Sequence, residues 1–81
     1  MKQDWIKKYN YGDKCEDNKI SVADGWTNNR EALIDIRDLG TQKGVLLETY
    51  DLTPNKNRKF KEYFNTRNEA IKRAIQIMEK F

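Results

Sequence analysis

The last fifteen residues constrain the fold most, because they predict an amphipathic helix whose apolar side needs a surface to pack against. The start of this helix is marked by Thr66-Arg67-Asn68-Glu69. This is a capping box, in which the Thr66 hydroxyl accepts from the Glu69 amide and the Glu69 carboxylate reaches back. Apolar residues then recur at helical spacing: Ala70, Ile71, Ala74, Ile75, Ile77, Met78 and Phe81. We therefore predict a helix over residues 67–81.

Three segments before this helix alternate apolar and polar side chains with the period of two that is typical of strands. They cover residues 32–39, 45–52 and 59–64, with turns at 40–44 and 53–57 between them. Connections of about five or six residues cannot make parallel crossovers, so these strands must form an antiparallel sheet. One face of this sheet is the only candidate cover for the helix, and we expect it to carry Ile34, Ile36, Val45, Leu47, Phe60 and Phe64.

The first thirty residues give a weaker pattern. Residues 19–22 are a candidate fourth strand that ends near Asp24-Gly25-Trp26. Residues 4–11 fit either a short helix, which the spacing of Trp5, Ile6 and Tyr9 favours slightly, or an extended arm. The expected fold is α+β, with an antiparallel sheet of three or four strands packed on one C-terminal helix. Residues 1–81 form one domain, in which 1–30 are less regular and 31–81 hold the sheet and helix.

The composition argues against catalysis and against a metal centre. The chain has no histidine and one cysteine, Cys15, so a disulfide within the chain, a zinc site and histidine-dependent acid–base chemistry are not expected. No nucleophile or phosphate-binding glycine loop accompanies the carboxylates. The chain lacks an apolar run long enough for a signal peptide or a membrane span. We expect a cytoplasmic, non-enzymatic protein without a cofactor.

Positive charge is concentrated in the last third of the chain. Residues 1–52 contain 8 basic and 10 acidic side chains, whereas residues 53–81 contain 8 basic and 3 acidic ones. This asymmetry favours an anionic partner for the C-terminal part.

Strand alternation predicts which side chains the sheet presents on the face away from the helix. These are Leu33, Asp35, Arg37, Glu48, Tyr50, Lys59, Lys61 and Tyr63. Cations interleaved with tyrosines are typical of nucleic-acid sites, because the cations neutralise phosphates and the rings stack on bases. The candidate nucleic-acid-binding residues, including those of the adjacent turn and the helix start, are Arg37, Tyr50, Lys56, Arg58, Lys59, Lys61, Tyr63 and Arg67.

Two other interpretations stay open at this point. In the first, the face is an ordinary solvated surface on which Arg37, Glu48 and Lys61 form ion pairs across strands. In the second, the chain binds a protein, as would a phage or mobile-element inhibitor of a host nucleic-acid enzyme, of which an anti-CRISPR protein is one example. The aromatic anchors would then be Trp5, Tyr9, Tyr11 and Trp26, although Trp26 is better explained as a core residue.

Three motifs together resemble a known family. They are Glu48-Thr-Tyr-Asp51, Arg58-Lys-Phe-Lys61 and Tyr63-Phe-Asn-Thr-Arg-Asn-Glu-Ala70. This arrangement resembles the arm-type DNA-binding domain at the N-terminus of phage and transposon tyrosine recombinases, over residues 32–74. The resemblance implies a three-stranded antiparallel sheet against a C-terminal helix, with the sheet in the DNA major groove. It also implies that Tyr50, Arg58, Lys59 and Lys61 face the DNA.

Overall fold

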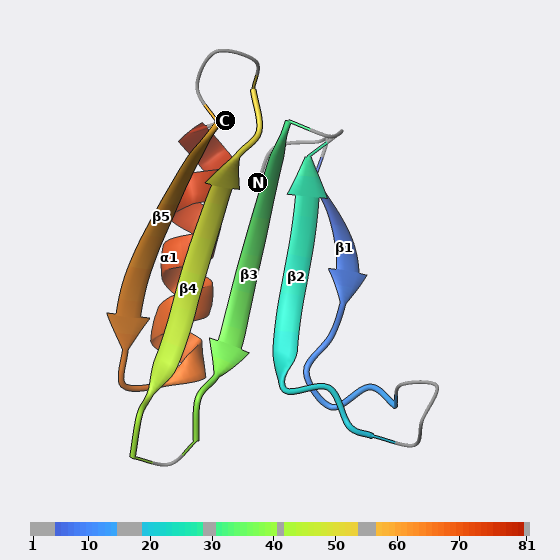
Figure 1. The fold of residues 1–81 in the computed structure, drawn as a ribbon, viewed down its shortest axis with the longest axis vertical. Coiled ribbons are helices and arrows are strands. Elements are labelled where there is room, and N and C mark those ends of the chain that lie inside the picture. Colours follow the sequence, from blue (N-terminus) through green and yellow to red (C-terminus); the bar gives the residue numbers. More distant parts are fainter. Residues whose placement is uncertain (1–4, 15–18, 29–30, 41, 54–56, 81) are drawn as a thin grey trace.

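The computed structural model describes residues 5–14, 19–28, 31–40, 42–53 and 57–80. Its strands are β1 (Trp5–Tyr9), β2 (Ala23–Asn28), β3 (Ala32–Asp38), β4 (Val45–Asp51) and β5 (Arg58–Phe64), followed by the helix α1 (Arg67–Lys80). Each strand pairs antiparallel with the next one along the chain, so the sheet is a five-stranded meander in the order β1-β2-β3-β4-β5. The helix packs on one face of this sheet, against β3, β4 and β5 (Figure 1).

The C-terminal helix and its cap are confirmed. The Glu69 amide donates to Thr66 Oγ1 at 3.3 Å, and the Thr66 hydroxyl donates to the Glu69 carboxylate at 3.0 Å. The side chain therefore satisfies one of the amides that a helix leaves unpaired at its start. The helix runs to Lys80, and residue 81 lies outside the described residues.

Alternation along residues 32–64 is also confirmed, and it divides the sheet into two faces. Ile34, Thr49 and Phe60 are neighbours across β3, β4 and β5, and they share the face toward the helix. Asp35, Glu48 and Lys61 form the next row of neighbours and occupy the other face. We call this second face, which no described element covers, the open face.

The core lies between α1 and the centre of the sheet. Ile34, Ile36, Leu47 and Met78 are fully buried there, and the small side chains of Ala70 and Ala74 let the helix lie close to the strands. Both tryptophans belong to this core, since Trp5 is 7 % exposed and Trp26 is 9 % exposed. The Trp5 indole N–H donates to the Met78 carbonyl oxygen at 3.2 Å and so ties β1 to the last turn of α1. The core role expected for Trp26 is confirmed.

Phe60 departs from the expected pattern. It lies on the helix side of β5, as predicted, but it is 51 % exposed. β5 is an edge strand of the sheet, so no further strand flanks this ring on its outer side. Phe60 instead lines a groove of about 620 Å³ between β5 and α1, together with Ile77 and Arg73.

The expected number of strands was too low, because the N-terminal part contributes two strands. Residues 5–9 form the edge strand β1 and not a short helix, since their backbone pairs with β2. Residues 19–22 are not a regular strand: Ile20 makes one isolated bridge to Lys14, and β2 begins only at Ala23. The strand predicted for 19–22 was therefore placed too early in the chain.

Candidate nucleic-acid interface on the open face

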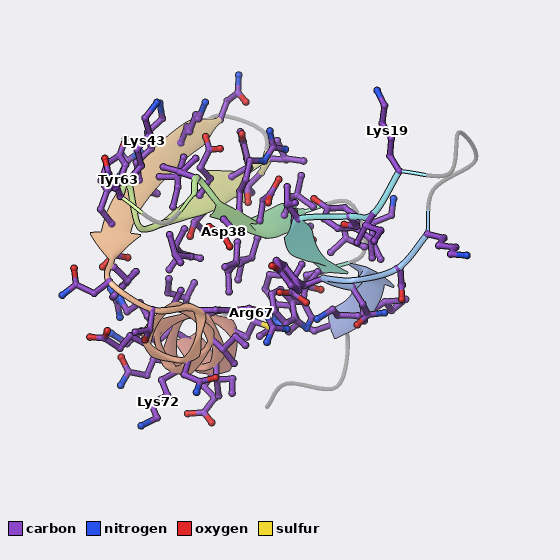
Figure 2. The ribbon with its side chains drawn as sticks, turned by 90° about the horizontal axis from the view of Figure 1, so that it is seen from below. Lys19, Asp38, Lys43, Tyr63, Arg67 and Lys72 are labelled. Atoms are coloured by element: carbon purple, nitrogen blue, oxygen red, sulfur yellow. The ribbon has the colours of Figure 1, made fainter. Side chains whose placement is uncertain are left out.

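Three rows of neighbouring side chains cross the open face from β1 or β2 toward β5. The first row contains Ile6, Thr27, Leu33, Tyr50 and Lys59. The second row contains Tyr9, Gly25, Asp35, Glu48 and Lys61. The third row contains Ala23, Arg37, Leu46 and Tyr63. Figure 2 shows Tyr63 on the side of the sheet opposite the helix, with Lys43 of the β3–β4 turn beside it.

Tyr9 reaches the open face because of an irregularity in β1. The pairing register shifts between Lys7 and Tyr9, so that Lys7 lies on the helix side opposite Trp26 while Tyr9 lies opposite Gly25. A side chain on Gly25 would overlap the Tyr9 ring, and the glycine therefore lets this ring cross β2. The Tyr9 hydroxyl donates to Asp35 Oδ2 at 3.1 Å. Burial and the neighbouring Asp35 carboxylate raise the pKa of Tyr9 to about 12.

Asp35 is a buried carboxylate at the centre of the open face, 7 % exposed. Its Oδ2 accepts from Tyr9, and Arg37 Nη2 lies 3.5 Å from the same oxygen. Its Oδ1 is buried and has no hydrogen-bond partner among the described residues. Most buried polar atoms are hydrogen-bonded, so this oxygen is an unusual feature of the face.

Glu48 lies directly across from Asp35, on β4. Its Oε2 accepts from the Tyr50 hydroxyl at 3.0 Å and from Lys59 Nζ at 2.9 Å. The hydrogen bond from Lys59 lowers the pKa of Glu48, with smaller contributions in the same direction from Tyr50 and Lys61. The Lys59 ammonium also lies 5.2 Å from the centre of the Tyr50 ring. Glu48 is thus ion-paired across the strands with Lys59, whereas the interpretation of the face as an ordinary surface expected Lys61 in this place.

The structure brings together five of the eight residues predicted to bind nucleic acid. Arg37, Tyr50, Lys59, Lys61 and Tyr63 share the open face.

The other three predicted residues do not join this group. Arg58 lies opposite Asp51 in the pairing of β4 with β5. Its position alternates with that of Lys59, so its side chain is on the face toward the helix and not on the open face. Arg67 lies between the helix and the β1–β2 part of the molecule (Figure 2). Lys56 lies outside the described residues.

Arg67 instead binds Asp24, a fully buried carboxylate on the helix side of β2. Arg67 Nε donates to Oδ2 at 2.7 Å, and its Nη2 donates to Oδ1 at 3.0 Å. Lys7 Nζ and the Tyr11 amide also donate to Oδ1, at 3.0 and 3.1 Å. Burial by itself would raise the pKa of Asp24, but the hydrogen bonds from Arg67, Tyr11 and Lys7 outweigh it and lower the pKa to about 2. This cluster joins β1, β2 and α1.

The four aromatic residues of the protein-binding alternative do not form one surface. Trp5 and Trp26 are core residues, Tyr9 bends across the open face, and only Tyr11 is largely exposed. The Tyr11 ring lies 5.4 Å from the guanidinium carbon of Arg67.

Sequence reasoning missed Tyr9 and Gly25 as parts of the open face. The relevant sequence feature is Gly25, a glycine that leaves room for the ring of a neighbouring strand. This feature identifies Tyr9 as the ring only once the pairing of β1 with β2 and its shift in register are known.

The comparisons with known proteins gave no relative: no protein-family model, no curated protein and no solved structure matches the chain. Within the described residues, no three side chains of His, Cys, Asp or Glu are grouped as metal ligands would be. In the same part of the chain, α1 is too short and too polar to cross a membrane.

Proposed function

We propose that the protein binds nucleic acid, and DNA in the first instance, through the open face. The observation that carries this proposal is an uncovered sheet face on which Arg37, Lys59 and Lys61 alternate with Tyr50 and Tyr63. Lys61 and Tyr63 are both exposed, and Tyr63 is 65 % exposed, so both are accessible to a ligand. The resemblance of residues 32–74 to a recombinase DNA-binding domain supports DNA as the partner.

The charges on the open face decide how strong this binding should be. Three cations stand against the two carboxylates Asp35 and Glu48, so the face carries a small net positive charge. Lys61 makes no hydrogen bond or ion pair with a described residue, which makes it the cation most available to a phosphate. Because few phosphates would be neutralised, we expect a shallow dependence on salt, with a slope of roughly −2 to −3 in log K against log salt.

A fluorescence anisotropy titration with labelled DNA of random sequence, at low and physiological salt, tests the proposal. The informative variant is Lys61→Gln, because Lys59→Gln would also remove the partner of Glu48. The matched control is Lys72→Gln, which makes the same change of charge on the outer side of the helix, away from the sheet (Figure 2).

We expect Lys61→Gln to weaken binding severalfold and to lower the salt slope by roughly one, while Lys72→Gln leaves both unchanged. Equal effects of the two substitutions would show that only net charge matters and would contradict a site on the open face. No binding at low salt would overturn the proposal and favour the protein-partner alternative.

A further inference from the structure

The width of the sheet limits which form of nucleic acid can lie on the open face. Five strands spaced about 4.8 Å apart span roughly 19 Å. The major groove of B-form DNA is about 12 Å wide and admits a helix or a two-stranded ribbon. The open face as a whole therefore cannot enter this groove.

Charge on the open face is segregated by strand. The cations Lys59 and Lys61 lie on β5, whereas the carboxylates lie on β3 (Asp35) and β4 (Glu48). Arg37, at the end of β3, is the exception. A phosphate placed over β3 or β4 would meet like charge, while one over β5 would meet Lys61. The charges therefore favour a sugar–phosphate backbone that follows β5.

The groups beside β5 suit bases better than phosphates. On β4, Tyr50 presents a ring next to Glu48, and on β5 itself Tyr63 presents an exposed ring at the other side of the second row. Tyrosine rings stack on unpaired bases of any sequence. About 10 Å separates β5 from β3, a distance that a nucleotide spans from its phosphate to the edge of its base.

Glu48 has an acceptor that remains available. Tyr50 and Lys59 both donate to Oε2, and Oε1 accepts no hydrogen bond from any residue of the described ranges. Asp35, directly across from Glu48 on β3, also has an oxygen without a described partner, but this Oδ1 is buried, which leaves Glu48 Oε1 as the acceptor for a base. Carboxylate oxygens accept from the exocyclic amino group of cytosine, where thymine presents a carbonyl oxygen instead.

We infer that the open face takes a single strand of nucleic acid, with its backbone along β5 and its bases over β4 and β3, where Glu48 Oε1 accepts from a base amino group. This inference rests on the proposed function and deepens it. It assigns the cations on β5 to the phosphates, and it assigns Tyr50 and Glu48 of β4, with the exposed Tyr63 ring at the end of β5, to the bases.

The first test compares a random single-stranded DNA of about 12 nucleotides with a duplex of the same length and composition, at low salt, by fluorescence anisotropy. We expect the single strand to bind about tenfold more tightly than the duplex. A duplex that binds equally or better would overturn the inference and leave the proposed function standing. Failure of both to bind would overturn the proposed function itself.

The second test compares oligo(dC) with oligo(dT) on the wild type and on Glu48→Gln. The wild type should prefer oligo(dC) by about fivefold, which corresponds to one charge-assisted hydrogen bond of modest strength. Glu48→Gln should bind oligo(dT) at least as tightly as the wild type, because a negative charge is gone and Lys59 loses its ion-pair partner. Its preference for oligo(dC) should be smaller, because a neutral amide oxygen is a weaker acceptor than a carboxylate.

Two controls separate base recognition from a merely structural role. Glu31→Gln removes a charge from an exposed carboxylate in the turn before β3 and should leave the preference unchanged. Lys61→Gln should weaken binding of both oligonucleotides equally. Equal losses for oligo(dC) and oligo(dT) in Glu48→Gln would show that Glu48 only supports the fold of the face, and would overturn its assignment to the bases.

Discussion

The buried carboxylate of Asp24 should contribute a large share of the stability of this small domain. Its pKa falls from 3.8 to about 2 in the folded protein, where Arg67 and Lys7 donate to it. One pKa unit corresponds to about 1.4 kcal/mol, so the shift is worth roughly 2 kcal/mol at neutral pH. A domain of this size has a total stability of about 4–12 kcal/mol. The Asp24 cluster therefore accounts for a substantial part of the free energy of unfolding.

The substitution that tests this reasoning is Asp24→Asn, which keeps the size of the side chain and one carbonyl oxygen for the Tyr11 amide. Arg67 and Lys7 keep 41 % and 31 % of their side-chain area exposed, so both cations can be hydrated after the charge is lost. We expect the free energy of unfolding at pH 7 to fall by about 2–3 kcal/mol. Urea unfolding followed by tryptophan fluorescence measures it, because Trp5 and Trp26 are both buried.

The dependence on pH distinguishes this cause from a packing defect. A carboxyl group whose pKa is lower in the folded state stabilises the protein above its unfolded pKa of about 3.8 and loses this contribution as the pH falls through 2. Between pH 5 and pH 2 the wild type should lose about 2 kcal/mol more than Asp24→Asn does. Glu31→Gln, the exposed control, should follow the wild type. An Asp24→Asn variant within 0.5 kcal/mol of the wild type at pH 7, or with the same acid slope, would refute the argument.

Two further measurements address the second row of the open face and the helix cap. In an ultraviolet titration, one tyrosine of the wild type should ionise near pH 12, and Gly25→Ala should lower that pKa by displacing Tyr9 from Asp35. Because the pKa of Tyr9 is higher in the folded than in the unfolded protein, the contribution of Tyr9 to stability is present below pH 10 and is lost as the pH rises toward 12. A tyrosine pKa unaffected by Gly25→Ala would contradict the contact between Tyr9 and Asp35. Thr66→Ala should lower the free energy of unfolding by about 1 kcal/mol in chemical denaturation, whereas Thr66→Ser should be close to the wild type, and equal stability of all three would argue against the cap.

The part of the fold that local physics determines could be predicted from the sequence. The spacing of Ala70, Ala74 and Met78 sets the buried side of the helix, and Thr66 sets its start. Strict alternation between residues 32 and 64 sets the two faces of the sheet. These features depend on neighbours a few residues apart, and the signals in the sequence are correspondingly strong.

The strands β1 and β2 could not be predicted with the same success, because their form depends on partners far along the chain. Trp5 and Lys7 face the helix because β1 pairs with β2, and Trp5 donates to a carbonyl 73 residues away. The shift in register after Lys7 then turns Tyr9 to the opposite face. Nothing in the alternation of residues 4–11 marks this shift, and the spacing of the same residues slightly favoured a helix.

For the candidate site, alternation predicted the face on which each strand residue lies but not the ion pairs that these residues form. Alternation placed Lys59 and Lys61 on the same face, and the pairing register sets Lys61 opposite Glu48. The ion pair to Glu48 is nevertheless made diagonally by Lys59, which leaves Lys61 without an ion pair among the described residues. Arg67 was assigned to the site because of its charge, and only the fold shows that Asp24 takes it. The net charge of the C-terminal segment therefore overestimated the number of cations available to a ligand, because the carboxylates that pair with Lys59 and Arg67 lie on other strands, outside that segment.

The two N-terminal strands change both the stability and the chemistry of the domain. They supply Trp5 and Trp26 to a core that α1 and three strands alone would leave thin. They also widen the sheet from about 10 Å to about 19 Å and bring Tyr9 over Asp35 on the open face. The major groove of a duplex admits a two-stranded ribbon, and a sheet of this width does not fit into it as a whole. The same residues that complete the core thus make the open face wider than the groove-entering sheet that the resemblance of residues 32–74 led us to expect.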